Sequence, residues 1–168
     1  MKKIVLLSFF LSCTYFLQSQ VTLVKDINPG FSGSVPEKFI EFNEEFYFYA
    51  DSRTRSPFKD YGKELYKSDG TSAGTILVKD INSGNGDSLI DNFTIFNNQL
   101  YFSASDGANG VELWKTDGTD GGTVLAANIN PDDNSDPLNP IINSSNPINF
   151  KVFKDELYFS ANNGTNGI

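Results

Sequence analysis

Carboxylates are the side chains in this sequence with the most scope for chemistry, because its 168 residues include no histidine and one cysteine. A Ser-His-Asp triad, a Cys-His pair and an imidazole ligand for zinc are therefore excluded. Aspartate and glutamate together number 21, against 13 lysines and arginines. The chemistry left open is cation binding by carboxylates and acid–base catalysis by paired carboxyl groups.

The densest group of oxygen ligands is the stretch Asp-Asp-Asn-Ser-Asp, which offers Asp132, Asp133, Asn134 and Asp136. Calcium prefers carboxylate and amide oxygens, so these four residues are candidate calcium ligands. The stretch lacks the glycine and the distal glutamate of a calcium loop. The sequence leaves calcium open without requiring it, and no other cofactor is expected.

Two pairs of acids could be used for glycoside hydrolysis, Glu37 with Glu41 and Glu44 with Glu45. That reaction needs two carboxyl groups about 5 to 9.5 Å apart, a distance that a sequence does not fix. We expect a protein without enzymatic activity. A propeller that acts on carbohydrate, or binds glycans, through acids on its loops is the alternative.

Two Asp-Gly-Thr turns, at Asp69 and Asp117, could place a carboxylate on a cation. The simpler interpretation is structural, because Asp can bond the backbone two residues on and glycine adopts the left-handed conformation. Tyr66 and Trp114 could likewise stack on a sugar ring, but large aromatic side chains more commonly pack between sheets. The run of aromatic residues at 46–49 is interpreted as a strand covered on both faces.

The N-terminus has the pattern of a secretory signal peptide: Met1, Lys2 and Lys3, an apolar run at 4–17, then Gln-Ser-Gln. The run is shorter than the roughly 18 apolar residues of a membrane span. We expect residues 1–19 to be removed and the protein to be secreted or held at the cell surface. Lipid attachment at Cys13 is the alternative, although the next residues stay apolar where a lipoprotein turns polar.

The net charge of −8 excludes two classes of partner, because nucleic acid and anionic lipid both need a basic footprint. The loss of Lys2 and Lys3 with the leader makes the mature chain more acidic still. Cys13 is the only cysteine, so no disulfide can form within the mature chain.

Internal repeats organise the rest of the chain. The block Leu-Val-Lys-Asp-Ile-Asn at 23–28 returns at 77–82 and, without its Lys and Asp, at 125–130. A second block occurs twice, at 64–71 and 112–119, and a third recurs at 46–48, 100–104 and 157–161. The repeats predict tandem units at approximately 20–75, 76–123 and 124–168, the last truncated.

Each unit resolves into four short strands bounded by turn signals. In the middle unit we expect strands at 93–96, 99–105, 111–116 and 123–129, with Asn97-Asn98 as a two-residue hairpin turn. The copy at 22–27 is predicted to be a strand as well. No sustained helical period follows the leader, so the fold class is all-β, with propeller-like blades of four strands.

The second block also resembles the ELWxxDGT repeat family, and the resemblance covers residues 21–168. The residues that carry it are Glu64, Leu65, Tyr66, Asp69, Gly70 and Thr71 in one copy, and Glu112, Leu113, Trp114, Asp117, Gly118 and Thr119 in the other. The resemblance implies an exported bacterial protein with many tandem repeats, propeller-like, for which no catalytic residues are established. Tyr66 departs from the motif by replacing its Trp.

These features together predict a binding or adhesion module that binds a surface protein or a glycan and has no membrane span. A closed propeller uses about 4 to 8 blades and this sequence supplies fewer than three. We therefore expect it to be a fragment of a longer protein, with further repeats of the same chain.

Overall fold

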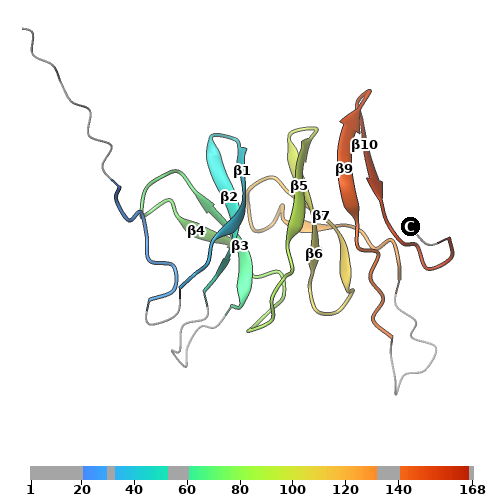
Figure 1. Cartoon of the computed structure of the whole chain (residues 1–168), viewed down its shortest axis with the longest axis horizontal. Coiled ribbons are helices and arrows are strands. Elements are labelled where there is room, and N and C mark those ends of the chain that lie inside the picture. The colour runs from blue at the N-terminus through green and yellow to red at the C-terminus, as the bar shows by residue number, and fades with distance from the viewer. Residues whose placement is uncertain (1–20, 30–32, 53–60, 132–140, 167–168) are drawn as a thin grey trace, which may run out of the picture.

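The computed structural model describes residues 21–29, 33–52, 61–131 and 141–166, and in these segments it contains ten strands and no helix (Figure 1). The first sheet comprises β1 (Glu37–Phe42), β2 (Glu45–Asp51), β3 (Lys63–Ser68) and β4 (Ile76–Lys79). The second comprises β5 (Asp91–Phe96), β6 (Gln99–Ser105), β7 (Val111–Thr116) and β8 (Val124–Ala127). The third is a hairpin of β9 (Ile148–Phe153) and β10 (Glu156–Ser160).

Every sheet is an antiparallel meander in which strands adjacent in sequence are adjacent in space. The predicted all-β class is confirmed, and none of the three sheets closes on itself. No helix of the described segments is long and apolar enough to cross a membrane.

The same kind of two-residue turn joins the first two strands of each sheet. Asn43 and Glu44, Asn97 and Asn98, and Lys154 and Asp155 all have positive φ. Two consecutive residues with positive φ are typical of the two-residue turns whose twist matches that of paired strands. The predicted turn at Asn97-Asn98 is confirmed, and it recurs in each sheet.

The predicted strand at 22–27 is wrong, because residues 21–26 adopt no strand in the structure. The later copy of this block, β4, gains its ladder by pairing with the motif strand β3. Among the described residues, no motif strand pairs with the first block.

The last strand of the middle unit is shorter than predicted, since β8 covers 124–127 instead of 123–129. The hydroxyl of Thr123 is turned to Thr116, with 2.7 Å between the two oxygens. At the other end, the N–H of Ile129 donates to the carboxylate of Glu112 at 2.8 Å. The N–H of Thr123 donates to the carbonyl of Asp120 in the turn before β8 at 3.3 Å, so a side chain replaces the ladder only at the Ile129 end.

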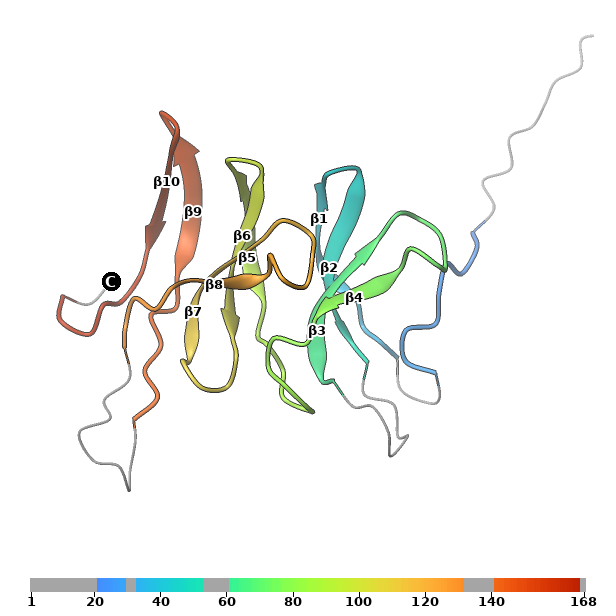
Figure 2. The same ribbon diagram turned by 180° about the vertical axis from the view of Figure 1, so that it is seen from behind.

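The three sheets follow one another along the long axis of the molecule (Figures 1 and 2). We call the face that a sheet turns toward the start of the row its leading face, and the opposite face its trailing face. The main core lies at the first junction, where Tyr47 and Leu65 on the trailing face of the first sheet pack with Phe102 and Trp114 on the leading face of the second. Trp114 thus packs between sheets, as predicted.

Each junction is also bridged by a buried glutamate of the motif. Glu64 accepts the N–H groups of Ile81 at 2.8 Å and Asn82 at 3.3 Å, together with a hydrogen bond from the Ser88 side chain. Ser88 itself joins the sheets, because its N–H donates to the carbonyl of Lys63 and its own carbonyl accepts from Ser105. The carboxyl group of Glu64 therefore holds the connection between the first and second sheets.

The second junction repeats this arrangement with Glu112, which is fully buried. Its carboxylate accepts the N–H of Ile129 at 2.8 Å, the N–H of Ser145 at 2.8 Å and the hydroxyl of Ser145 at 2.6 Å. The motif glutamate is thus a structural acceptor for the backbone that leads from one sheet to the next.

Burial predicts a pH dependence of stability through Glu64, because it raises the pKa of this carboxyl group to about 8 despite the donors around it. The folded chain then keeps a proton that the unfolded chain releases above about pH 4.5. The stabilisation that comes from this retained proton is fully present below pH 4.5 and is lost as the pH rises toward 8. We expect the free energy of unfolding to fall between pH 5 and 8, by at most about 1.4 kcal/mol per pH unit.

The measurement is urea denaturation of the mature chain across this pH range, with Glu64→Gln as the control. Gln does not titrate, so its stability should be flat over the same window even if it is lower throughout. An equal slope in both proteins would show that another group is responsible.

Candidate functional site

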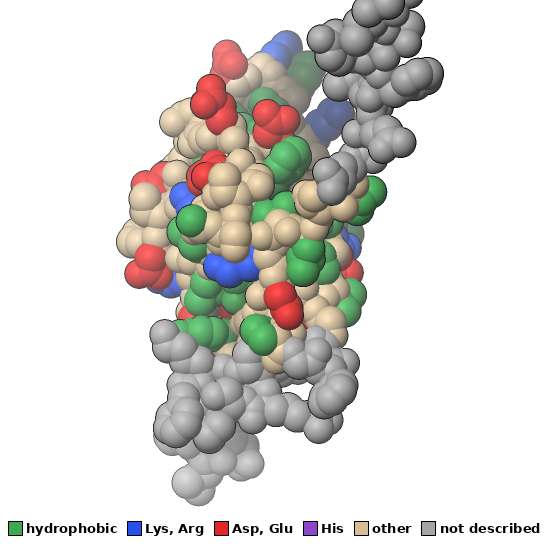
Figure 3. Space-filling view, turned by 90° about the vertical axis from the view of Figure 1, so that its left-hand side faces the viewer, with side chains coloured by type: hydrophobic (Ala, Val, Ile, Leu, Met, Phe, Trp, Pro, Cys, Tyr) green, Lys and Arg blue, Asp and Glu red, His purple; other side chains and the backbone are tan. Residues whose placement is uncertain are grey.

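An apolar groove of about 680 Å³ lies on the leading face of the first sheet, at one end of the row. Figure 3 views this end of the molecule and shows hydrophobic side chains among charged ones. The groove is lined by side chains from the first sheet, from the turn before β4 and from the N-terminal segment: Leu23, Val24, Lys25, Ile27, Ser34, Pro36, Phe39, Phe46, Phe48, Ser68, Gly70 and Thr75.

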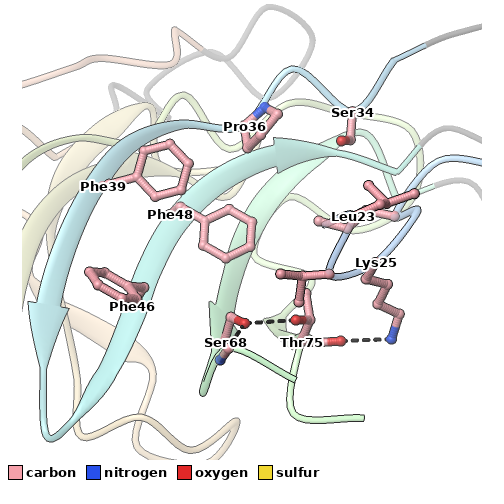
Figure 4. Close-up of a pocket in the computed structure, with 12 residues that line it drawn as sticks. Leu23, Lys25, Ser34, Pro36, Phe39, Phe46, Phe48, Ser68 and Thr75 are labelled. Atoms are coloured by element: carbon pink, nitrogen blue, oxygen red, sulfur yellow. Dashed lines mark hydrogen bonds between the residues drawn. The ribbon is translucent and has the colours of Figure 1, made fainter. Parts of the chain in front are cut away.

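Aromatic rings from β1 and β2 form the floor of the groove (Figure 4). The pairing of the two strands is irregular between Glu37 and Ile40, and Lys38 has a positive φ there. Phe39 lies within this irregularity, and its ring stacks on that of Phe48 with centroids 5.3 Å apart. Phe39 and Phe46 remain 60% and 52% exposed, whereas Phe48 is 4% exposed. The floor therefore offers apolar area that the chain leaves uncovered.

The N-terminal segment at 23–27 forms one wall of the groove. Lys25 donates through Nζ to the carbonyl of Thr75 at 2.7 Å, and the hydroxyls of Thr75 and Ser68 are 2.7 Å apart (Figure 4). Ile27 packs against the buried cluster that contains Phe48 and Tyr66. This wall is held by one charged hydrogen bond and by apolar packing.

The second sheet shows what normally covers such a face. In the repeat alignment Phe46 and Phe48 correspond to Leu100 and Phe102, and both of these are fully buried at the first junction. The cover there is the trailing face of the preceding sheet. The groove is therefore the open counterpart of a surface that a neighbouring sheet covers elsewhere in the molecule.

Tyr66 stacks on Phe48, a ring of the groove floor, with centroids 6.0 Å apart, and is 7% exposed. Burial raises the pKa of its hydroxyl, while a hydrogen bond with Ser52 acts in the opposite direction. The hydroxyl therefore stays neutral at physiological pH, and among the described residues that line the groove Lys25 is the only charged one. The site suits an apolar partner with a few polar contacts at its rim.

The other motif acids lie in tight turns. Oδ1 of Asp69 accepts the N–H and the hydroxyl of Thr71 at 2.8 and 2.7 Å. Asp117 makes the same two bonds with Thr119 at 2.9 and 2.7 Å. These hydrogen bonds lower the pKa of both carboxyl groups. Each aspartate acts as the acceptor that shapes its turn, and neither lines the groove.

This geometry predicts a modest effect for Asp117→Ala. The loss of two hydrogen bonds that shape a turn should lower the free energy of unfolding by about 0.5 to 2 kcal/mol, by analogy with a lost helix cap. Thermal melting of the mature chain measures it, with and without a chelator. If a chelator lowered the melting temperature of the wild type and not that of Asp117→Ala, a bound cation would replace the structural interpretation.

The structure brings none of the predicted acid pairs to the groove. Glu37 forms an ion pair with Lys63 at 3.1 Å, and Glu45 forms one with Lys67 at 3.0 Å. No group of three or more Asp, Glu, Cys or His side chains that could hold a metal ion exists in the part of the chain that the structure describes. The candidate calcium ligands Asp132, Asp133, Asn134 and Asp136 lie outside the described residues, as do Cys13 and the leader at 1–19.

Sequence reasoning missed the groove because it interpreted the aromatic run at 46–49 as covered on both faces. That interpretation is wrong at Phe46, which is half exposed, and correct at Tyr47 and Phe48. The useful signal was the repeat alignment: Phe46 and Phe48 are the first copy of Leu100 and Phe102, and no sheet precedes the first copy in the described chain.

Comparisons of the chain with protein-family models, with curated proteins and with solved structures gave no match.

Proposed function

We propose that the chain is an exported, non-enzymatic binding or adhesion module of the cell surface, built of blades of a β-propeller. The observation that carries this proposal is the groove on the leading face of the first sheet. A contiguous apolar face on a soluble protein marks a surface that meets a partner. Phe39 and Phe46 form that face, and their counterparts in the next sheet are buried against a neighbour.

Two further features support export and the propeller arrangement. The charged start and apolar run of residues 1–19 are typical of a secretory leader. The repeated four-stranded meanders, stacked face to face, have the strand order of propeller blades. The partner we favour is a protein surface, because a sheet is what covers the equivalent face at the first junction.

A glycan is the second candidate ligand. The exposed ring of Phe39, which stacks on Phe48, offers an apolar surface to a sugar ring, and Ser34, Ser68 and Thr75 line the same groove. Turnover of a polysaccharide by the purified chain, abolished by the substitution of one acid, would favour the carbohydrate-active alternative over a binding module.

The export part of the proposal is tested by producing the whole chain in a bacterial host and measuring the mass of the exported product. Cleavage after Ser19 gives an unmodified chain that begins at Gln20. A chain that begins at Cys13 and carries a lipid would replace secretion by membrane anchoring.

The binding part is tested with Phe46→Asp, because a charge in the apolar floor should abolish attachment of the purified mature chain to cell envelopes and to immobilised glycans. Ile95→Asp is the matched control, since Ile95 is similarly exposed at 43% but lies on the second sheet outside the groove. Equal binding by both variants would remove the groove from the function.

A further inference from the structure

Two kinds of ring pair recur in all three sheets at equivalent positions. Their centroids are 5.3 to 6.3 Å apart. The leading pairs are Phe39–Phe48, Phe93–Phe102 and Phe150–Phe159. The trailing pairs are Phe42–Tyr47, Phe96–Tyr101 and Phe153–Tyr158. Every sheet therefore carries both halves of the same kind of junction.

The halves meet twice within the molecule. At the first junction, Phe42 and Tyr47 share one buried cluster with Phe102, against which Phe93 packs. At the second junction, Phe96 and Tyr101 face Phe159 across a small hollow. A trailing pair against a leading pair is thus the established contact between sheets.

One half of each kind remains exposed. The leading face of the first sheet leaves Phe39 and Phe46 exposed in the groove. The hairpin β9–β10 leaves Phe153 and Tyr158 exposed at 58% and 48%. In the described structure these two faces lie at opposite ends of the row of sheets (Figures 1 and 2).

A third observation concerns the turn glycines. At the first junction, the hydroxyl of Tyr47 lies so close to Gly118 that a Cβ there would clash with it. Gly70 is the equivalent of Gly118 in the first sheet; it lines the groove, and a Cβ there would meet nothing within 4 Å. The position that a trailing-face tyrosine hydroxyl fills at Gly118 is open at Gly70.

Tyr158 is the equivalent of Tyr47 and has the same local partner. Its hydroxyl donates to Glu156 two residues earlier at 2.5 Å, as that of Tyr47 donates to Glu45 at 3.3 Å. The exposed hairpin therefore presents the tyrosine that the open position at Gly70 lacks.

We propose that a second copy of this chain docks head to tail in the groove, with Phe153 and Tyr158 of its β9–β10 hairpin against Phe39 and Phe46. Tyr158 of one copy then lies over Gly70 of the next. The inference rests on the proposed function and names the partner of that groove. Such a contact joins two different surfaces, so it generates rings or open chains of copies instead of a two-fold dimer.

The test is the molar mass of the mature chain in solution, by light scattering and sedimentation, over a wide range of concentration. The wild type should associate as concentration rises. Phe46→Asp and Tyr158→Asp should each weaken association at least about tenfold, as expected for aromatic anchors of an interface. Both residues are half exposed, so circular dichroism should show an unchanged fold, and Ile95→Asp should associate like the wild type.

Mixing the two variants gives the sharpest result. The Phe46→Asp copy keeps an intact hairpin and the Tyr158→Asp copy keeps an intact groove, so together they should form a one-to-one dimer that grows no further. A monomeric wild type at every concentration, or a mixture that stays monomeric, would overturn the inference.

The proposed function fails by a different result. A monomeric chain that still binds cell envelopes through Phe46 would overturn the second copy as partner and leave the binding function standing. A chain that associates as described, yet binds envelopes and glycans equally well with Phe46→Asp, would separate the groove from attachment at the cell surface.

Discussion

Replacement of Glu112 by alanine is expected to lower the free energy of unfolding by about 3 to 5 kcal/mol. The side chain is fully buried and accepts three hydrogen bonds, from Ile129 and twice from Ser145. Alanine leaves these donors without an acceptor, and each buried donor left unpaired costs about 1 to 3 kcal/mol. The loss is a large share of the stability of a small domain, about 5 to 15 kcal/mol.

Urea denaturation of the mature chain, followed by circular dichroism, measures this loss. Glu156→Ala is the control, because Glu156 also accepts a hydrogen bond but is exposed. Glu112→Gln keeps one acceptor oxygen and should lie between Glu112→Ala and the wild type, so the order is measurable even if the alanine variant does not fold. A loss below about 1 kcal/mol for Glu112→Ala would contradict its role at the junction.

Trp114→Ala is expected to destabilise the chain by about 3 to 5 kcal/mol, the range for the truncation of a large buried aromatic side chain. The indole is 6% exposed and lies in the cluster that joins Tyr47 and Leu65 of the first sheet to the second. Its Nε1–H has no hydrogen-bond partner within the described residues. The energetic role of Trp114 is therefore packing between sheets.

Trp114→Phe is the matched comparison. Because the indole N–H is unpaired, phenylalanine should keep most of the stability, with a loss of about 1 to 2 kcal/mol from the smaller ring. Thermal melting followed by circular dichroism compares the three proteins, since both substitutions remove the only tryptophan. Equal losses for alanine and phenylalanine would show that a polar contact of the indole, and not its packing, holds the junction.

The local structure could be predicted well from the sequence, because the same strand and turn patterns occur in more than one repeat. The turn at Asn97-Asn98 and the strands β6 and β7 follow from turn chemistry and from matching blocks, and their bounds agree with the prediction. The class of fold follows from the absence of a helical period. These features depend on residues near one another in the chain.

The sequence could not predict which faces stay exposed, because that depends on contacts between sheets. Phe46 and Leu100 are equivalent in the alignment, yet Phe46 is half exposed and Leu100 is fully buried. The role of the motif glutamates could not be predicted either, because Glu112 accepts a hydrogen bond from Ser145, which lies 33 residues away in the chain. The first copy at 23–28 has the same sequence as 77–82, which begins within β4, but no strand of the described residues pairs with it, so its pattern alone predicted a ladder that is absent.

The most direct test of the groove as a docking surface is hydrogen exchange on the mature chain, compared between dilute and concentrated samples. Head-to-tail docking should add protection to two separated regions, β1 with β2 at one end of the row and β9 with β10 at the other. Protection at the first junction, which is already buried, should not change. Added protection confined to other segments, such as the turns at Asp69 and Asp117, or no change at any concentration, would contradict the assignment of the groove as a docking surface for a second copy.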